Sequence, residues 1–133
     1  MAITMSATLK TARSQSIVTQ AGSTAYLSIY SGTQPAEAQI TTGLGTQLVV
    51  LPMSNPIGVS AASILTLSAI TQTNAIGTGT AVFGRIQTAS TSGIAGVLDL
   101  SVGVSGADIN INTTSITLGG PVAVTASGTF TEQ

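Results

Sequence analysis

About a third of this chain consists of residues branched at Cβ, with 22 Thr, 13 Ile and 10 Val among 133 residues. Branched side chains lose rotamer freedom in a helix, whereas they pack well on a pleated sheet. Segments rich in Gly, Ser, Thr and Asn separate the apolar segments, as is typical of turns. The sequence therefore predicts an all-β fold.

The expected strands follow a two-residue period. In residues 25–30, three apolar residues alternate with two tyrosines and a serine, which indicates a half-buried strand. Strands recur about every 15 residues with turns between them, so we expect a single-domain β-sandwich or barrel of the jelly-roll type. The other predicted strands are 47–52, 63–70, 80–88, 96–104, 109–116 and 122–130. The predicted core is led by Val82, Ile86, Leu98, Leu100, Val102, Val104, Val122 and Val124, followed by Leu65, Leu67, Ile109 and Ile111.

Residues 6–21 are the one segment with helical features. Ser6 can cap the first turn, and Gly22 suits the left-handed residue that often ends a helix. Several threonines weaken the helix, so an extended arm is the alternative. We divide the chain into an N-terminal helix or arm, residues 1–22, and a β-sandwich domain, residues 23–133. The expected apolar stripe of the helix comprises Leu9, Ala12, Ser16 and Ile17.

Charged residues make up 5% of the chain, against about 25% in ordinary soluble domains, and His and Cys are absent. The chain therefore lacks Ser-His-Asp and Cys-His nucleophiles, zinc sites built on His or Cys, iron–sulfur clusters and disulfides. Three basic residues cannot supply a strong phosphate or anionic-membrane footprint. No apolar run approaches the ~20 residues of a spanning helix. We expect a protein that is not an enzyme, with no cofactor, no direct nucleic-acid contact and no membrane contact.

Asp99 and Asp108 are the candidate pair of carboxylates. Paired carboxylates can carry acid–base chemistry or hold a hard cation. The alternative, which we favour, places Asp99 on the polar face of a strand. It places Asp108 in a turn, where its side chain bonds to its own backbone.

The basic residues suggest two kinds of contact. If 80–88 and 96–104 form a hairpin, Arg85 and Asp99 lie within diagonal reach on one face, which predicts an ion pair within the chain. A salt bridge between subunits is the alternative. Lys10 and Arg13 share one face of the predicted helix. That face is either solvated or docked on an acidic partner surface.

The net charge of −1 bears on association. Freely diffusing proteins normally carry interspersed charges and a net charge away from zero, because near-neutral apolar surfaces associate. We therefore expect much of this surface to be covered by copies of the chain or by a partner. Closed cyclic symmetry is the usual solution, so the sequence predicts a cyclic homo-oligomer.

Three segments carry a resemblance to a known group: IYSGTQP at 29–35, FGRI at 83–86 and SGADININTTSI at 105–116. They resemble small proteins encoded among the structural genes of tailed bacteriophages, and the resemblance covers most of the chain in segment order. It implies a virion component assembled in the host bacterial cytoplasm, in particular a head decoration or cement protein bound to the major capsid protein. Lys10 and Arg13 then become the candidate lattice contact.

Three alternatives stay open. A tail or baseplate component would have the same composition and differ in copy number. A Thr-rich module that binds ice or glycans would need a flat hydroxyl array or an aromatic platform, whereas the hydroxyls here are scattered and aromatic residues are few. A small hydrolase that uses only carboxylates would depend on Asp99 and Asp108.

Overall fold

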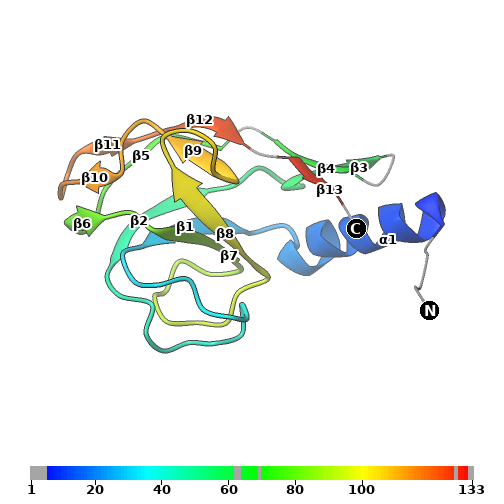
Figure 1. The fold of residues 1–133 in the computed structure, drawn as a ribbon, viewed down its shortest axis with the longest axis horizontal. Helices are drawn as coiled ribbons and strands as arrows, with labels where there is room; N and C mark the ends of the chain where they lie inside the picture. Colours follow the sequence, from blue (N-terminus) through cyan, green and yellow to red (C-terminus); the bar gives the residue numbers. More distant parts are fainter. Residues whose placement is uncertain (1–5, 62–63, 69, 128, 132–133) are drawn as a thin grey trace.

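The computed structural model describes residues 6–61, 64–68, 70–127 and 129–131 (Figure 1). A mixed six-stranded sheet with the order β12-β9-β8-β7-β1-β2 forms the body of the molecule and curls into a half-barrel. The expected all-β fold of the sandwich or barrel class with a short N-terminal helix is therefore confirmed. The strands of this sheet are β1 (Tyr26–Tyr30), β2 (Gln47–Pro52), β7 (Phe83–Gln87), β8 (Leu98–Gly103), β9 (Ile109–Ile111) and β12 (Val124–Ser127).

Three smaller sheets accompany the large one. They have the orders β13-β4-β3, β10-β6 and β11-β5. The helix α1 (Ala7–Ala21) packs on β3 and β4. Together α1, β3, β4 and β13 form a protrusion that extends from the body on the right of Figure 1. The strands of the small sheets are β3 (Gly58–Ala61), β4 (Ile64–Leu67), β5 (Thr73–Asn74), β6 (Gly79–Thr80), β10 (Ser115–Ile116), β11 (Pro121–Val122) and β13 (Thr129–Thr131).

Both predicted ends of α1 are confirmed. Ser6 is the N-cap, and its side chain accepts a hydrogen bond from the N–H of Leu9 at 3.1 Å. Gly22 follows the last turn with a φ of 70°, and its N–H donates to the carbonyl of Val18. The predicted apolar stripe is confirmed only at Ile17, which packs against the core, whereas Leu9 is 47% exposed. Among the described side chains of α1, the buried ones are Val18 and Ala21. The described side chains of α1 that reach the core thus lie toward its C-terminal end.

The core lies on the concave side of the curled sheet and includes most of the predicted residues. Two predictions are wrong, because Val82 and Val104 are 42% and 59% exposed. Val82 precedes β7 and Val104 follows β8, so neither takes part in the alternation of its strand. Leu98 and Val124 are partly buried against the core. The predicted residues that are buried are Leu65, Leu67, Ile86, Leu100, Val102, Ile109, Ile111 and Val122.

Strand β1 is buried on both faces, which contradicts the half-buried strand expected there. Ser28 and Tyr30, on the face predicted to be polar, are fully buried. Segments 31–46 and 88–97 run under this convex side of the sheet, below β1 and β7 in Figure 1. These two loops cover the face of β1 that the alternation of residues 25–30 predicts to be exposed to solvent.

Candidate functional site

The central strand β7 is buried at all five positions, although Arg85 and Gln87 are polar. Strands in the middle of a sheet read as apolar when both of their faces are buried. Here the side chains that face the covering loops find polar partners in those loops instead. This buried polar layer is the most distinctive arrangement of side chains in the described part of the molecule.

Arg85 joins the sheet to both loops. Its Nε and Nη2 donate to Oδ1 and Oδ2 of Asp99 at 2.7 and 2.9 Å, which is a bidentate ion pair. Its Nη1 donates to the carbonyls of Ile40 and Ile94 at 2.7 and 3.0 Å. The structure therefore brings Arg85 and Asp99 together within one chain. They lie directly opposite each other in the β7–β8 ladder rather than on a diagonal.

The ion pair between Arg85 and Asp99 is shielded from solvent. The side chain of Arg85 is 0% exposed and that of Asp99 is 5% exposed. Both carboxylate oxygens accept from the same guanidinium, and a third guanidinium nitrogen is satisfied by two carbonyls. Buried charges are tolerated when they are paired and hydrogen-bonded in this way. The arrangement holds two loops in place and leaves no reactive group open to a substrate.

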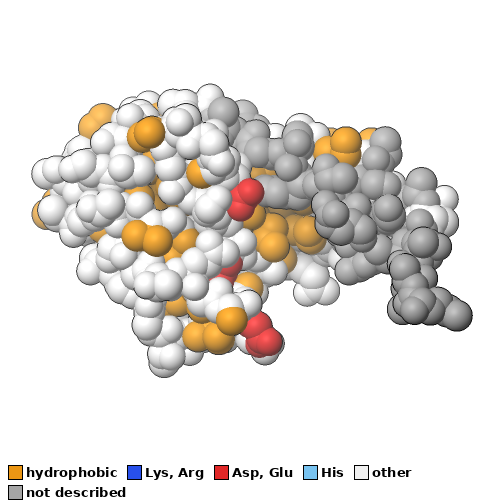
Figure 2. Space-filling model, in the orientation of Figure 1, with side chains coloured by type: hydrophobic (Ala, Val, Ile, Leu, Met, Phe, Trp, Pro, Cys, Tyr) orange, Lys and Arg blue, Asp and Glu red, His pale blue; other side chains and the backbone are white. Residues whose placement is uncertain are grey.

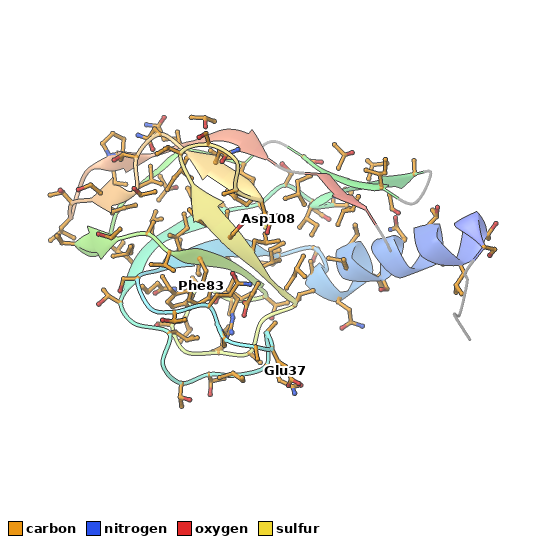
Figure 3. The ribbon with its side chains drawn as sticks, in the orientation of Figure 1. Glu37, Phe83 and Asp108 are labelled. Atoms are coloured by element: carbon orange, nitrogen blue, oxygen red, sulfur yellow. The ribbon has the colours of Figure 1, made fainter. Side chains whose placement is uncertain are left out.

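Gln87 continues the polar layer. Its Nε2 donates to the carbonyls of Ala89 and Thr91 at 2.8 Å each, which ties the second loop to the end of β7. Its Oε1 accepts from the hydroxyl of Tyr30 at 3.1 Å. The ring of Tyr30 stacks on Phe83 with centroids 5.4 Å apart, and Leu44 closes this small second core. Phe83 lies between the sheet and the loops in Figure 3.

Replacing Tyr30 by Phe tests this layer. The ring and its stacking remain, but the buried Oε1 of Gln87 loses its donor, so we expect the free energy of unfolding to fall by about 1 kcal/mol. Urea unfolding measures the change. Tyr26→Phe is the matched control, because it removes a hydroxyl from a half-buried ring on the same strand and should change stability by less than about 0.5 kcal/mol. Equal losses in both variants would contradict the role of the Gln87 contact.

The two predicted carboxylates have separate partners. Asp99 forms its ion pair with Arg85, whereas Oδ2 of Asp108 accepts a hydrogen bond from the N–H of Ser101 at 3.1 Å. In return, the N–H of Asp108 donates to Oγ of Ser101 at 3.0 Å. Asp108 therefore bonds to the neighbouring strand and not to its own backbone as expected. These bonds tie β8 to the loop that leads back to β9.

The remaining predicted contact residues, Lys10 and Arg13, lie about one turn apart on α1. Their side chains lie outside the described part of the structure. Within the described residues, no three acidic side chains gather in a way that could hold a metal ion. No helix among the described residues has the length and continuous hydrophobicity of a membrane span.

Two of the hollows on the described part of the surface are candidate sites. One, of about 230 Å³, lies beside β10 and β11 and includes Asn112 and Ile116 in its wall. The amide of Asn112 is already satisfied, since it donates to the carbonyl of Pro121 and accepts from the N–H of Ala123. The second, an open hollow of about 430 Å³, lies where the two covering loops meet. It is lined by Glu37, Ala38, Gln39, Gly96 and Val97, and is called the loop hollow below.

Sequence patterns did not reveal the loop hollow, because its walls are 57 residues apart in the chain and meet only through loop contacts. The N–H of Gly96 donates to the carbonyl of Ala38 at 2.8 Å, which joins the two walls. The one local signal was that Glu37 is the only charged residue in segment 31–46.

Comparison with known proteins adds no relatives: no family model matches the chain, and no match was found among curated proteins or solved structures.

Proposed function

We propose that this protein is a non-enzymatic structural component of a tailed-bacteriophage virion, namely a head decoration or cement protein that binds the major capsid protein. The observation that carries the proposal is the surface, which combines very few charges with exposed large apolar side chains. Such surfaces favour association over free diffusion. The resemblance of three segments to phage structural proteins supports the same assignment.

The exposed apolar side chains are spread over the molecule. Some belong to the protrusion, and others lie on the loops near β5, β10 and the ends of β7 and β8. Single exposed apolar residues are ordinary, but here few charged residues separate them. On the face shown in Figure 2, the charged side chains that can be seen are acidic and stand well apart. The exposed residues are Leu9, Val59, Ile64, Ile76, Val82, Val104 and Leu118.

A cement protein needs shape and contact area rather than catalysis. Each bound copy buries area across the joints between capsid subunits and opposes expansion of the shell. A repeating lattice lets many weak contacts act together. The hydrogen bonds from Arg85 hold the two covering loops against the sheet. Loops fixed in this way suit the role, because they keep their shape when internal pressure strains the shell. Lys10 and Arg13 on α1 are the proposed lattice contact.

Quantitative mass spectrometry of purified particles from the source phage tests the proposal. We expect hundreds of copies per particle, with density on the head in cryo-electron microscopy, because decoration follows the capsid lattice. A few copies or some dozens, located on the tail or baseplate, would support the tail alternative. Absence from purified particles would refute both virion assignments.

A further inference from the structure

The two covering loops, residues 31–46 and 88–97, bury almost no side chains of their own. All of their residues are described, and among them only Leu44 is buried. It joins Tyr30 and Phe83 in a small cluster that is separate from the main core. Regions with few buried apolar contacts open locally at a lower free energy than the whole domain unfolds. The loops therefore lack the apolar burial that stabilises the sheet.

Polar side chains of the sheet hold these loops instead. Nη1 of Arg85 donates to one carbonyl in each loop, that of Ile40 in the first and that of Ile94 in the second. Gln87 and Gln47 donate to three further carbonyls, all of them in the second loop. Arg85 therefore fixes both loops to one point of the sheet.

The two loops also contact each other. The N–H of Gly96 donates to the carbonyl of Ala38 at 2.8 Å. A Cβ at Gly93 would lie 3.9 Å from the carbonyl oxygen of Thr41, so the turn of the second loop lies against the first loop. When one loop leaves the sheet, the other loses this contact. The loops are therefore expected to open together.

The sheet does not need the loops for its own pairing. Residues 31–46 connect β1 to β2, and residues 88–97 connect β7 to β8, and in both cases the connected strands pair directly. Leu27, Ile29 and Ile86 of these strands belong to the main core on the other face of the sheet. Val97 is the exception within the second loop, since its N–H donates to the carbonyl of Ile86 and its side chain packs on the core.

We propose that residues 31–46 and 88–96 form one cooperative cover that unfolds locally as a unit, with Arg85 as its latch, while the six-stranded sheet stays folded. Figure 1 shows both loops on the same side of the sheet, below β1 and β7. Opening the cover brings Tyr30 and Phe83, which are fully buried when it is closed, into contact with solvent. The inference concerns the isolated chain and does not depend on the virion role.

Amide hydrogen exchange of the full-length chain, followed residue by residue by NMR, tests the cover. The loop reporters are the N–H groups of Gly32, Ile40 and Gly96, each of which donates to a carbonyl within the loops. The sheet reporters are the amides of Leu27 and Ile29 in β1, which pairs with a strand on both sides. In wild type, the loop reporters should share one opening constant, at least about tenfold larger than that of the sheet reporters.

Strain placed in the second loop distinguishes one unit from two. Gly93 has a φ of 72°, which is costly for a residue with a Cβ, and opening of the loop releases that cost. Gly93→Ala should therefore raise exchange at Gly32 and Ile40 of the first loop about fivefold. Gly106→Ala is the matched control, because Gly106 has a φ of 73° with open space around its Cβ position and lies between β8 and β9, outside the cover. It should leave exchange at the loop reporters unchanged.

The variant R85M/D99L tests the latch, because it removes the donor to both loops without leaving a buried charge unpaired. Exchange at all three loop reporters should rise at least about tenfold relative to the sheet reporters.

Loop reporters that exchange no faster than the sheet reporters in wild type would overturn the inference, because the cover would then open only with the whole chain. Acceleration confined to Gly96 in Gly93→Ala would also overturn it, since the loops would then open separately. Loop exchange in R85M/D99L equal to that of wild type would exclude Arg85 as the latch. If R85M/D99L does not fold, Gly93→Ala and its control still decide whether the cover is one unit. None of these results changes the expected copy number in particles.

Discussion

Replacing Asp99 by Ala is expected to lower the free energy of unfolding by about 3–5 kcal/mol, the cost of leaving a buried charge without its partner. The guanidinium of Arg85 would stay at 0% exposure with two of its nitrogens unsatisfied. A small domain has about 5–15 kcal/mol of stability in total, so this loss removes a large share of it. Urea unfolding should show a lower midpoint with a similar slope.

A double variant separates the charge from the packing. R85M/D99L removes both charges and keeps apolar volume, so it should be more stable than Asp99→Ala. It should still be less stable than wild type, because the carbonyls of Ile40 and Ile94 lose their donor. Glu37→Ala, which removes an exposed carboxylate, serves as the control and should cost less than about 0.5 kcal/mol. If Asp99→Ala matched that control, the ion pair would not hold the loops.

The sequence predicted local features well and covering layers poorly. Strand β2 was predicted with the correct ends, and β1 to within one residue, because alternation is a property of neighbouring residues. The Arg85–Asp99 contact lies within one hairpin and was also accessible to local reasoning. Its burial was not, because the carbonyl of Ile40 that completes it comes from a loop 45 residues away in the chain.

The missed and misplaced elements have related causes. Strand β3 has the sequence GVSA, which is too short and too weakly apolar to show a period. The predicted strand 109–116 is divided between β9 and β10, and 122–130 is divided among β11, β12 and β13. Each piece pairs with a different partner strand, which the sequence does not reveal. The loop hollow escaped prediction for the same reason, since loop–loop contacts create it.

The low charge of the chain can be reconciled with its buried ion pair. Arg85, one of three basic residues, and Asp99, one of four acidic residues, are paired in the interior. Their burial leaves the surface with still fewer charges. Polar groups of the covering loops can only be buried if the sheet offers partners, and Arg85 and Gln87 supply donors to four loop carbonyls. The pair thus serves to fix irregular backbone on the convex side of the sheet, which an apolar residue could not do.

Gly96→Ala is expected to lower the free energy of unfolding by about 1–3 kcal/mol through overpacking against the ion pair. A Cβ at this position would lie 2.6 Å from Cδ of Arg85 and closer still to Cγ. The stem of Arg85 cannot move aside cheaply, because its guanidinium is held by two carboxylate oxygens and two carbonyls. Either Arg85 loses these bonds or the loop moves off the sheet and opens the loop hollow.

A mutant cycle identifies Arg85 as the cause. In the R85A/D99A background the stem is gone, so adding Gly96→Ala should cost much less than in wild type, with a coupling of about 1 kcal/mol or more. Gly103→Ala is the matched control, because its nearest neighbour, Cβ of Ala107, would lie at 3.3 Å, a tight contact that a shift of a few tenths of an ångström relieves, and has no link to Arg85. If the changes in the free energy of unfolding were additive in the cycle, the loop would pack against the sheet independently of the ion pair. The ion pair would then not be what fixes the walls of the loop hollow.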